Sequence, residues 1–164
     1  MNTNLRGWIT CLVVAVTSTG AATFASAQTL TFTVVPGAAC LARNGNEETY
    51  LRHGLMGTGN NLGGVGSPAI DVICPLTRLT SGDIQGPVVR VFVLRDASAT
   101  LPLSCTLDAR TASGLPTGAQ TKSFNGTGEG TIDLALTSLG PYDYYQVLCT
   151  LPYLSGVRSI RVQN

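Results

Sequence analysis

Residues 103–108 (LSCTLD) and 144–151 (YYQVLCTL) share the pattern that decides the fold. In both segments apolar and polar residues alternate around a single cysteine, and a period of two is typical of a β-strand with one buried face. The expected inward-facing residues are Leu103, Cys105 and Leu107 in the first segment and Tyr145, Val147, Cys149 and Leu151 in the second. The sequence therefore predicts two strands whose cysteines both point into the core.

The same period recurs along most of the chain. Residues 29–35 alternate cleanly, with Leu30, Phe32 and Val34 on one face, and residues 87–94 are apolar on both faces, which is typical of a central strand. Further strands are expected at residues 47–56, 69–74, 131–136 and 157–163, and residues 119–124 are a ninth candidate. The 19 Gly and 8 Pro interrupt the chain too often for long helices.

So many short, one-sided strands predict an all-β fold. Two packed antiparallel sheets bury such strands because each sheet hides its apolar face against the other. We therefore expect a disulfide-stapled two-sheet β-sandwich, Ig-like or jelly-roll-like, with a small β-barrel as the alternative.

The beginning of the chain predicts export. Residues 1–27 combine the basic Arg6, an apolar run over residues 8–16 and the small-residue site Ala25-Ser26-Ala27. This order is typical of a cleaved signal peptide, and the apolar run is about half of the ~20 residues that span a bilayer. We expect a single domain over residues 28–164, with no transmembrane segment in the mature chain, located in the periplasm or outside the cell.

Four cysteines remain once Cys11 leaves with the signal peptide. In an exported chain, four cysteines predict two disulfides, for which three pairings are open. The similar strand-like settings of Cys105 and Cys149 favour Cys105–Cys149, which leaves Cys40–Cys74. If Cys105 and Cys149 both face inward, we expect their bridge to cross between the two sheets, as in immunoglobulin-type domains.

The chain resembles a group of small exported bacterial proteins of unassigned function. The resemblance rests on Cys40, on Cys74-Pro75, on the segment 104–107 (SCTL) and on the segment 149–152 (CTLP). It implies a disulfide-bonded β-sandwich and carries over no activity. The likeness to immunoglobulin-like domains is architectural, because Val147 stands where their tyrosine is expected and the only tryptophan lies in the signal peptide.

The sequence contains no recognisable catalytic, cofactor or metal motif. His53 is the only histidine, and we interpret it as a solvated residue on a strand edge rather than as a general base. Adjacent Glu47 and Glu48 would point to opposite faces of a strand, and the other carboxylates lack the spacing of a calcium loop. The glycine-rich stretch 57–66 lacks the ending of a phosphate-binding loop, so we interpret it as a flexible connection. A catalytic pair of carboxylates that only the fold brings together stays an open alternative.

Exposed tyrosines are the candidate binding residues. Counting back from Cys149 places Tyr142 and Tyr144 on the outer face, and Tyr153 follows the strand. Tyrosine offers apolar area and a polar tip to a glycan or a protein. Without Arg6, nine basic residues balance nine acidic ones, so we expect no nucleic-acid partner. A noncatalytic structural or adhesive module ranks first, a carbohydrate- or protein-binding module second, and a secreted inhibitor or small hydrolase third.

The intact mass of the exported protein tests the export and disulfide predictions together. We expect a chain that starts at Gln28 and takes up no alkylating reagent under nonreducing conditions, because all four thiols are oxidised. A mass that includes residues 1–27, or thiols that alkylate, would contradict this interpretation.

Overall fold

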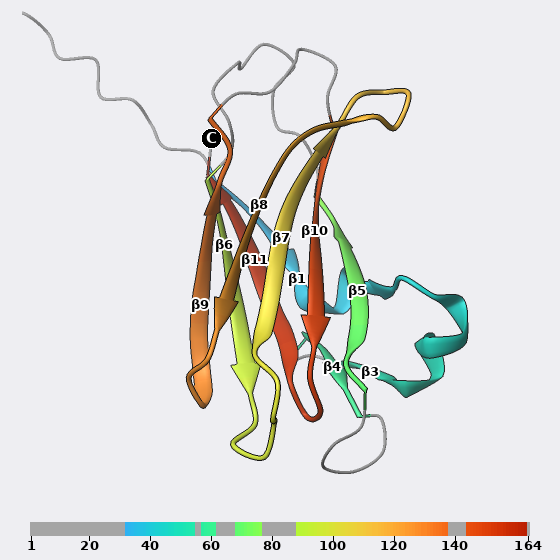
Figure 1. The fold of residues 1–164 in the computed structure, drawn as a ribbon, viewed down its shortest axis with the longest axis vertical. Helices are drawn as coiled ribbons and strands as arrows, with labels where there is room; N and C mark the ends of the chain where they lie inside the picture. The colour runs from blue at the N-terminus through green and yellow to red at the C-terminus, as the bar shows by residue number, and fades with distance from the viewer. Residues whose placement is uncertain (1–31, 55–56, 62–67, 77–87, 138–143, 164) are drawn as a thin grey trace, which may run out of the picture.

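A computed structural model describes residues 32–54, 57–61, 68–76, 88–137 and 144–163 of the chain. These residues form two antiparallel sheets that face each other across one core (Figure 1). No helix in the described part of the chain is long and apolar enough to cross a membrane. The prediction of an all-β sandwich is confirmed.

The first sheet, here called the β11 sheet, has the order β3-β4-β11-β6-β9, and β1 pairs with the remaining part of β11. Its strands are β1 (Phe32–Pro36), β3 (Leu51–Gly54), β4 (Gly57–Asn60), β6 (Val88–Arg95), β9 (Gly128–Ala135) and β11 (Gly156–Gln163).

The second sheet, the β10 sheet, has the order β2-β5-β10-β7-β8. Its strands are β2 (Leu41–Ala42), β5 (Ile70–Pro75), β7 (Leu103–Arg110), β8 (Pro116–Phe124) and β10 (Tyr144–Leu151). Two short 3₁₀ helices, η1 (Gly37–Ala39) and η2 (Gly45–Tyr50), connect the early strands of the two sheets.

The core lies between the inner faces of the sheets. The alternation read from the sequence holds, because every predicted inward-facing residue of β7 and β10 is buried. The opposite sheet contributes Val89, Val91, Val93, Ile132, Leu134, Val157, Ile160 and Val162, which are also buried. Burying one such side chain stabilises the fold by about 1.5–3 kcal/mol.

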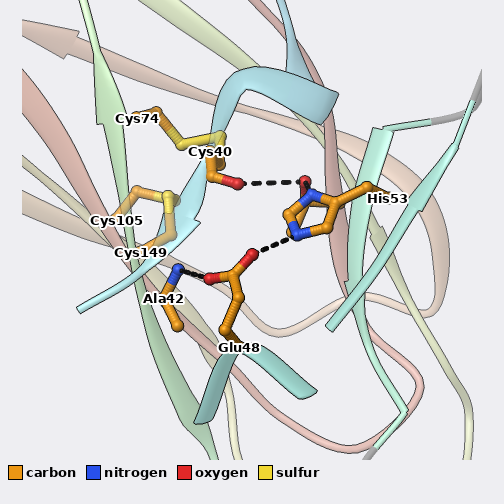
Figure 2. The surroundings of a disulfide bond; sticks show 8 residues. Cys40, Ala42, Glu48, His53, Cys74, Cys105 and Cys149 are labelled. Atoms are coloured by element: carbon orange, nitrogen blue, oxygen red, sulfur yellow. Dashed lines mark hydrogen bonds and ion pairs between the residues drawn. A yellow bond between two sulfur atoms is a disulfide. The ribbon is translucent and has the colours of Figure 1, made fainter. Parts of the chain in front are cut away.

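The predicted disulfide pairing, Cys40–Cys74 and Cys105–Cys149, is confirmed (Figure 2). The expectation that Cys105–Cys149 crosses between the sheets is wrong, because these residues are direct partners on the neighbouring strands β7 and β10. Cys40–Cys74 likewise joins the residue before β2 to β5, its partner in the same sheet. Each bridge closes a loop worth about 4 kcal/mol on the chain-entropy model.

Two sequence-based interpretations of the segment between residues 47 and 66 need correction. Glu47 and Glu48 lie in η2 and not in a strand, and β3 begins only at Leu51. Local bonds explain the turn: the Asn44 amide donates to Glu47, and Glu48 accepts from the Ala42 N–H. The start of the stretch 57–66 forms β4 rather than a flexible connection, and residues 62–67 lie outside the described residues.

The apolar face of the first predicted strand points outward. Phe32 and Val34 do share a face, but Phe32 is 53% exposed and Val34 is exposed as well. Val35, on the other face, packs against the core. The Arg161 guanidinium lies 3.9 Å from the centroid of the Phe32 ring, a cation–π contact that covers part of it.

Close backbone contacts on β11 require glycine at two positions. A β-bulge interrupts the β11–β6 register between Val157 and Ser159. A Cβ atom at Gly37 would lie 2.1 Å from the Val157 carbonyl oxygen, and one at Gly57 would lie 2.0 Å from the same atom. Gly57 also has a φ of +110°, which L side chains rarely adopt. Glycine therefore lets η1 and β4 approach the bulge from the strand edge.

We expect Gly57→Ala to lower the free energy of unfolding by at least about 2 kcal/mol, because the new methyl group meets backbone and strains φ. Chemical denaturation measures the change. Gly54→Ala is the matched control in the same hairpin, since a Cβ there has no atom within 4 Å. Equal stability of the two variants would contradict the role given to Gly57.

Candidate functional site

A groove of about 440 Å³ lies on the β11 sheet where β3, β4, β11 and β6 run side by side. Thr58, Val157 and Val93 are register partners and are buried on the inner face. Because successive side chains of a strand alternate between faces, the neighbouring row of Gly59, Gly156 and Leu94 belongs to the outer face. The groove therefore opens on the side of the sheet away from the core.

Glycine makes the groove hollow. Gly59 pairs with Gly156 on one side and with Arg52 on the other, so two adjacent strands carry no side chain at the centre. Gly54 and Gly57 also line the groove, but only Gly54 and Gly59 leave open space, because backbone of the neighbouring strand occupies the Cβ position at Gly57 and Gly156. A Cβ at Gly59 would meet only the Ser155 carbonyl oxygen, at 3.6 Å, so the floor is open to an approaching ligand.

The walls of the groove combine apolar and cationic groups. Leu94 and Leu154, both exposed, supply apolar contact area. Arg52 and Arg158 supply two guanidinium groups, and Asn61 supplies an amide whose oxygen accepts from Arg52 Nε and Nη2 at 3.2 Å in the orientation that satisfies both groups. Among the described residues that line the groove there is no Asp or Glu.

A second hollow, of about 420 Å³, borders the groove on the side of β9. Arg158 lines both hollows, and its guanidinium forms an ion pair with Glu129. The lining of this second hollow also includes Glu129, Phe92, Thr131 and Ser159. The outer face of the β11 sheet thus offers two adjoining depressions separated by one side chain.

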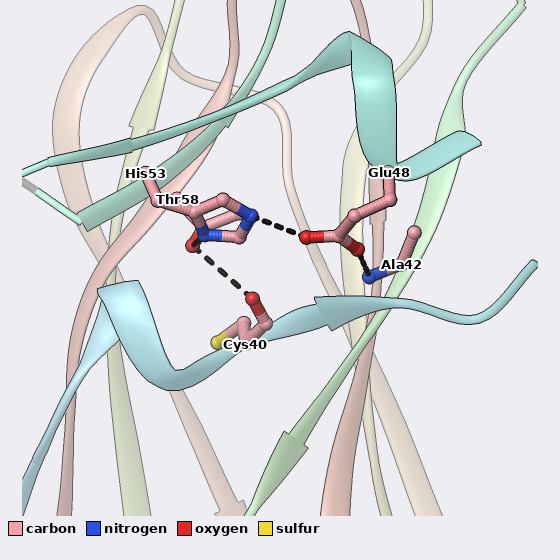
Figure 3. Close-up of polar contacts among 5 residues, drawn as sticks. All are labelled: Cys40, Ala42, Glu48, His53 and Thr58. Carbon is pink, nitrogen blue, oxygen red and sulfur yellow. Dashed lines mark hydrogen bonds and ion pairs between the residues drawn. The ribbon is translucent and has the colours of Figure 1, made fainter. Parts of the chain in front are cut away.

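A chain of polar contacts links Glu48, His53, Thr58 and Cys40 (Figure 3), and His53 and Thr58 also border the groove. His53 Nε2 lies 2.5 Å from Glu48 Oε1, and His53 Nδ1 lies 2.8 Å from Thr58 Oγ1. The Thr58 hydroxyl donates to the Cys40 carbonyl at 3.3 Å, while the other Glu48 oxygen accepts from the Ala42 N–H at 2.6 Å. The imidazole of His53 thus links the Glu48 carboxylate of η2 to the Thr58 hydroxyl of β4.

This chain places a hydroxyl, an imidazole and a carboxylate in the order of a hydrolytic triad, yet its geometry is structural. Thr58 is only 1% exposed, and its hydroxyl is already bonded to Cys40. A nucleophilic hydroxyl instead has to be exposed and free to attack. Glu48 instead joins β2 of one sheet to β3 of the other, and we call the set Glu48, His53 and Thr58 the brace.

The sequence predicted only part of this arrangement. His53 does lie on the edge strand β3, but both of its ring nitrogens are bonded rather than solvated. The sequence did not predict the contact between Glu48 and His53, because the strand expected over residues 47–56 placed Glu48 in a strand instead of in η2. The pKa of Glu48 lies below its usual range, first because the carboxylate accepts from the Ala42 N–H and further because of His53.

Two of the predicted tyrosine residues, Tyr144 and Tyr153, lie at opposite ends of β10. Tyr144 is 43% exposed at the start of β10, whereas Tyr153 follows the opposite end of that strand. The length of β10 separates them by more than roughly 20 Å. Tyr142 lies outside the described residues, and neither Tyr144 nor Tyr153 lines the groove.

Comparison with known proteins supports the fold. No protein-family model matches the chain, and no curated protein sequence matches it. Among solved structures, a xylan-binding module, CBM15, is similar at a TM-score of 0.54 and 10% identity, covering 82% of this chain and 96% of that one. A second module, BiXyn10A CBM1, has a TM-score of 0.47 and 7% identity over 80% of this chain and 96% of its own. The chain is thus a jelly-roll-like two-sheet β-sandwich, as in the first of these modules.

We expect Glu48→Gln to lower stability at pH 7 by about 1 kcal/mol, a modest value because the carboxylate is partly exposed. The folded-state pKa of Glu48 is depressed, so the stabilisation is present above the usual value near 4.5 and is lost as pH falls through the folded-state pKa. Denaturation curves of both proteins should therefore converge in acid.

Glu129→Gln is the control for this experiment, because the Glu129 carboxylate is largely exposed and lies outside the brace. A Glu48→Gln effect that persists unchanged below the folded-state pKa would show that the brace does not depend on the charge.

Proposed function

We propose that this chain is a noncatalytic extracellular module that binds a carbohydrate in the groove on the β11 sheet. The observation that carries the proposal is the groove itself, whose glycine floor lies between apolar and hydrogen-bonding walls. Binding pockets for organic ligands combine apolar lining with a few placed polar groups in this way.

The walls match the two kinds of surface that a sugar presents. Leu94 and Leu154 can contact the apolar C–H face of a ring, and Arg52 and Asn61 can bond its hydroxyl groups. Guanidinium nitrogens donate only, whereas the Asn61 amide both donates and accepts. A hydroxyl group, which does both, therefore finds suitable partners along one side of the groove.

The adjoining hollow favours a polymer over a small molecule. A ligand that fills the groove and passes Arg158 enters the space beside Phe92, Thr131 and Ser159. Two hollows side by side offer successive sites to successive units of a chain. Shape therefore supports a polysaccharide lying across the strands of the sheet.

The fold and the disulfides fit this proposal. The similar solved structure is named as a xylan-binding module, and its ligand is a property of that protein. Two buried disulfides persist in an oxidising compartment, which agrees with export through the signal peptide expected over residues 1–27. We propose that the mature chain, residues 28–164, acts in the periplasm or outside the cell.

A side chain added to the floor tests the groove. We expect Gly59→Val to weaken binding to a polysaccharide at least tenfold, because the new isopropyl group occupies ligand space while the backbone tolerates it. Affinity gel electrophoresis against a polysaccharide panel, followed by calorimetry on the strongest ligand, measures the change.

Gly118→Val is the matched control, since Gly118 is a strand glycine of the other sheet with only an ordinary contact to Leu136. Unchanged affinity of Gly59→Val would overturn the groove as the site. Loss of affinity in Tyr142→Ala or Tyr144→Ala would move the site to the tyrosines, which stay a prediction from the sequence.

A further inference from the structure

We infer that the groove selects carbohydrates that carry carboxylate groups, the uronates; this inference rests on the proposed function. Two guanidinium groups, of Arg52 and Arg158, flank one glycine floor. The described lining of the groove itself contains no carboxylate, and the one partner of Arg158, Glu129, lies in the adjoining hollow. An anionic sugar is therefore the complementary ligand.

Arg52 differs from the other arginines that the structure describes. Arg43, Arg90, Arg110 and Arg158 each pair with a carboxylate, Arg95 bonds backbone carbonyls at both ends of its guanidinium, and Arg161 stacks on Phe32. Within the same part of the chain no carboxylate pairs with Arg52, whose partner is the neutral Asn61 amide. Its charge at the wall of the groove is thus balanced by no carboxylate of the described residues.

The contact with Asn61 also leaves the other N–H donors of the Arg52 guanidinium available to a ligand. Asn61 takes one N–H from Nε and one from Nη2, so two of the five guanidinium donors are used. The edge formed by Nη1 and Nη2 faces no carboxylate among the described residues. A carboxylate binds such an edge with two parallel bonds, and the Asn61 contact holds the guanidinium in place for it.

Arg158 closes the other side of the groove. Its side chain is 27% exposed and pairs with Glu129, which is 69% exposed and lines the neighbouring hollow. Glu129 therefore fixes Arg158 at the border without placing a negative charge in the groove. A ligand carboxylate in the groove therefore gains its direct partner in Arg52, whereas the charge of Arg158 is already paired with Glu129.

Charge-assisted hydrogen bonds of this kind change affinity by about tenfold or more in a partly enclosed site. A neutral sugar makes the same hydroxyl contacts but leaves the Nη1–Nη2 edge of Arg52 to water. The groove consequently favours a carboxylated sugar over a neutral sugar that has the same hydroxyl groups.

The test compares each acidic polysaccharide with its own carboxyl-reduced form. Polygalacturonate, alginate and glucuronoxylan serve as probes, with dextran sulfate against dextran as the sulfate arm. We expect at least one uronate polymer to bind about tenfold more tightly than its reduced form, with a preference that weakens as salt rises. Arg52→Gln should remove this preference, and Arg43→Gln, which changes an exposed arginine of the other sheet, should keep it.

The outcomes separate this inference from the proposed function. Equal affinity for acidic and reduced forms, unaffected by Arg52→Gln but lost in Gly59→Val, overturns the charge selectivity and leaves a carbohydrate-binding groove. Tight binding of dextran sulfate alone overturns the assignment to uronates. Failure of every polysaccharide to bind overturns the proposed function itself.

Discussion

The packing of two apolar inner faces against each other is the constraint on which this structure depends. Both disulfides join neighbouring strands within the β10 sheet, so neither of them ties the two sheets together. The buried valines of β6 and leucines of β7 belong to one core cluster, which holds the two sheets together. Because burial on the inner faces supplies this stability, the outer face of the β11 sheet is not needed to hold the two sheets together.

Strand β11 contributes residues both to the core and to the groove. Its inner residues Ile160 and Val162 complete the core, while its outer face carries Gly156 in the floor and Arg158 at the border. The bulge after Val157 turns Arg158 away from the ladder and toward Glu129. Bulges frequently redirect a side chain in this way.

The sequence predicted whatever depends on local pattern. The alternation around Cys105 and Cys149 identified their strands and the faces on which they lie. It did not predict features that depend on which strands become neighbours. Cys105 and Cys149 both face inward whether their strands lie in one sheet or in two, and Gly59 and Gly156 meet only through the pairing of β4 with β11.

The brace and the groove use opposite faces of one hairpin, and this relation explains why the brace is needed. The β3–β4 hairpin lies at a sheet edge and pairs with β11 through only Gly156 and Val157. On its inner face His53 and Thr58 are held by Glu48 and by the Cys40 carbonyl. On its outer face Arg52 and Gly59 form the groove. Backbone bonds of Asn60 with Leu154 and Ser155 extend this pairing, and the inner contacts further stabilise an edge hairpin that would otherwise open more readily.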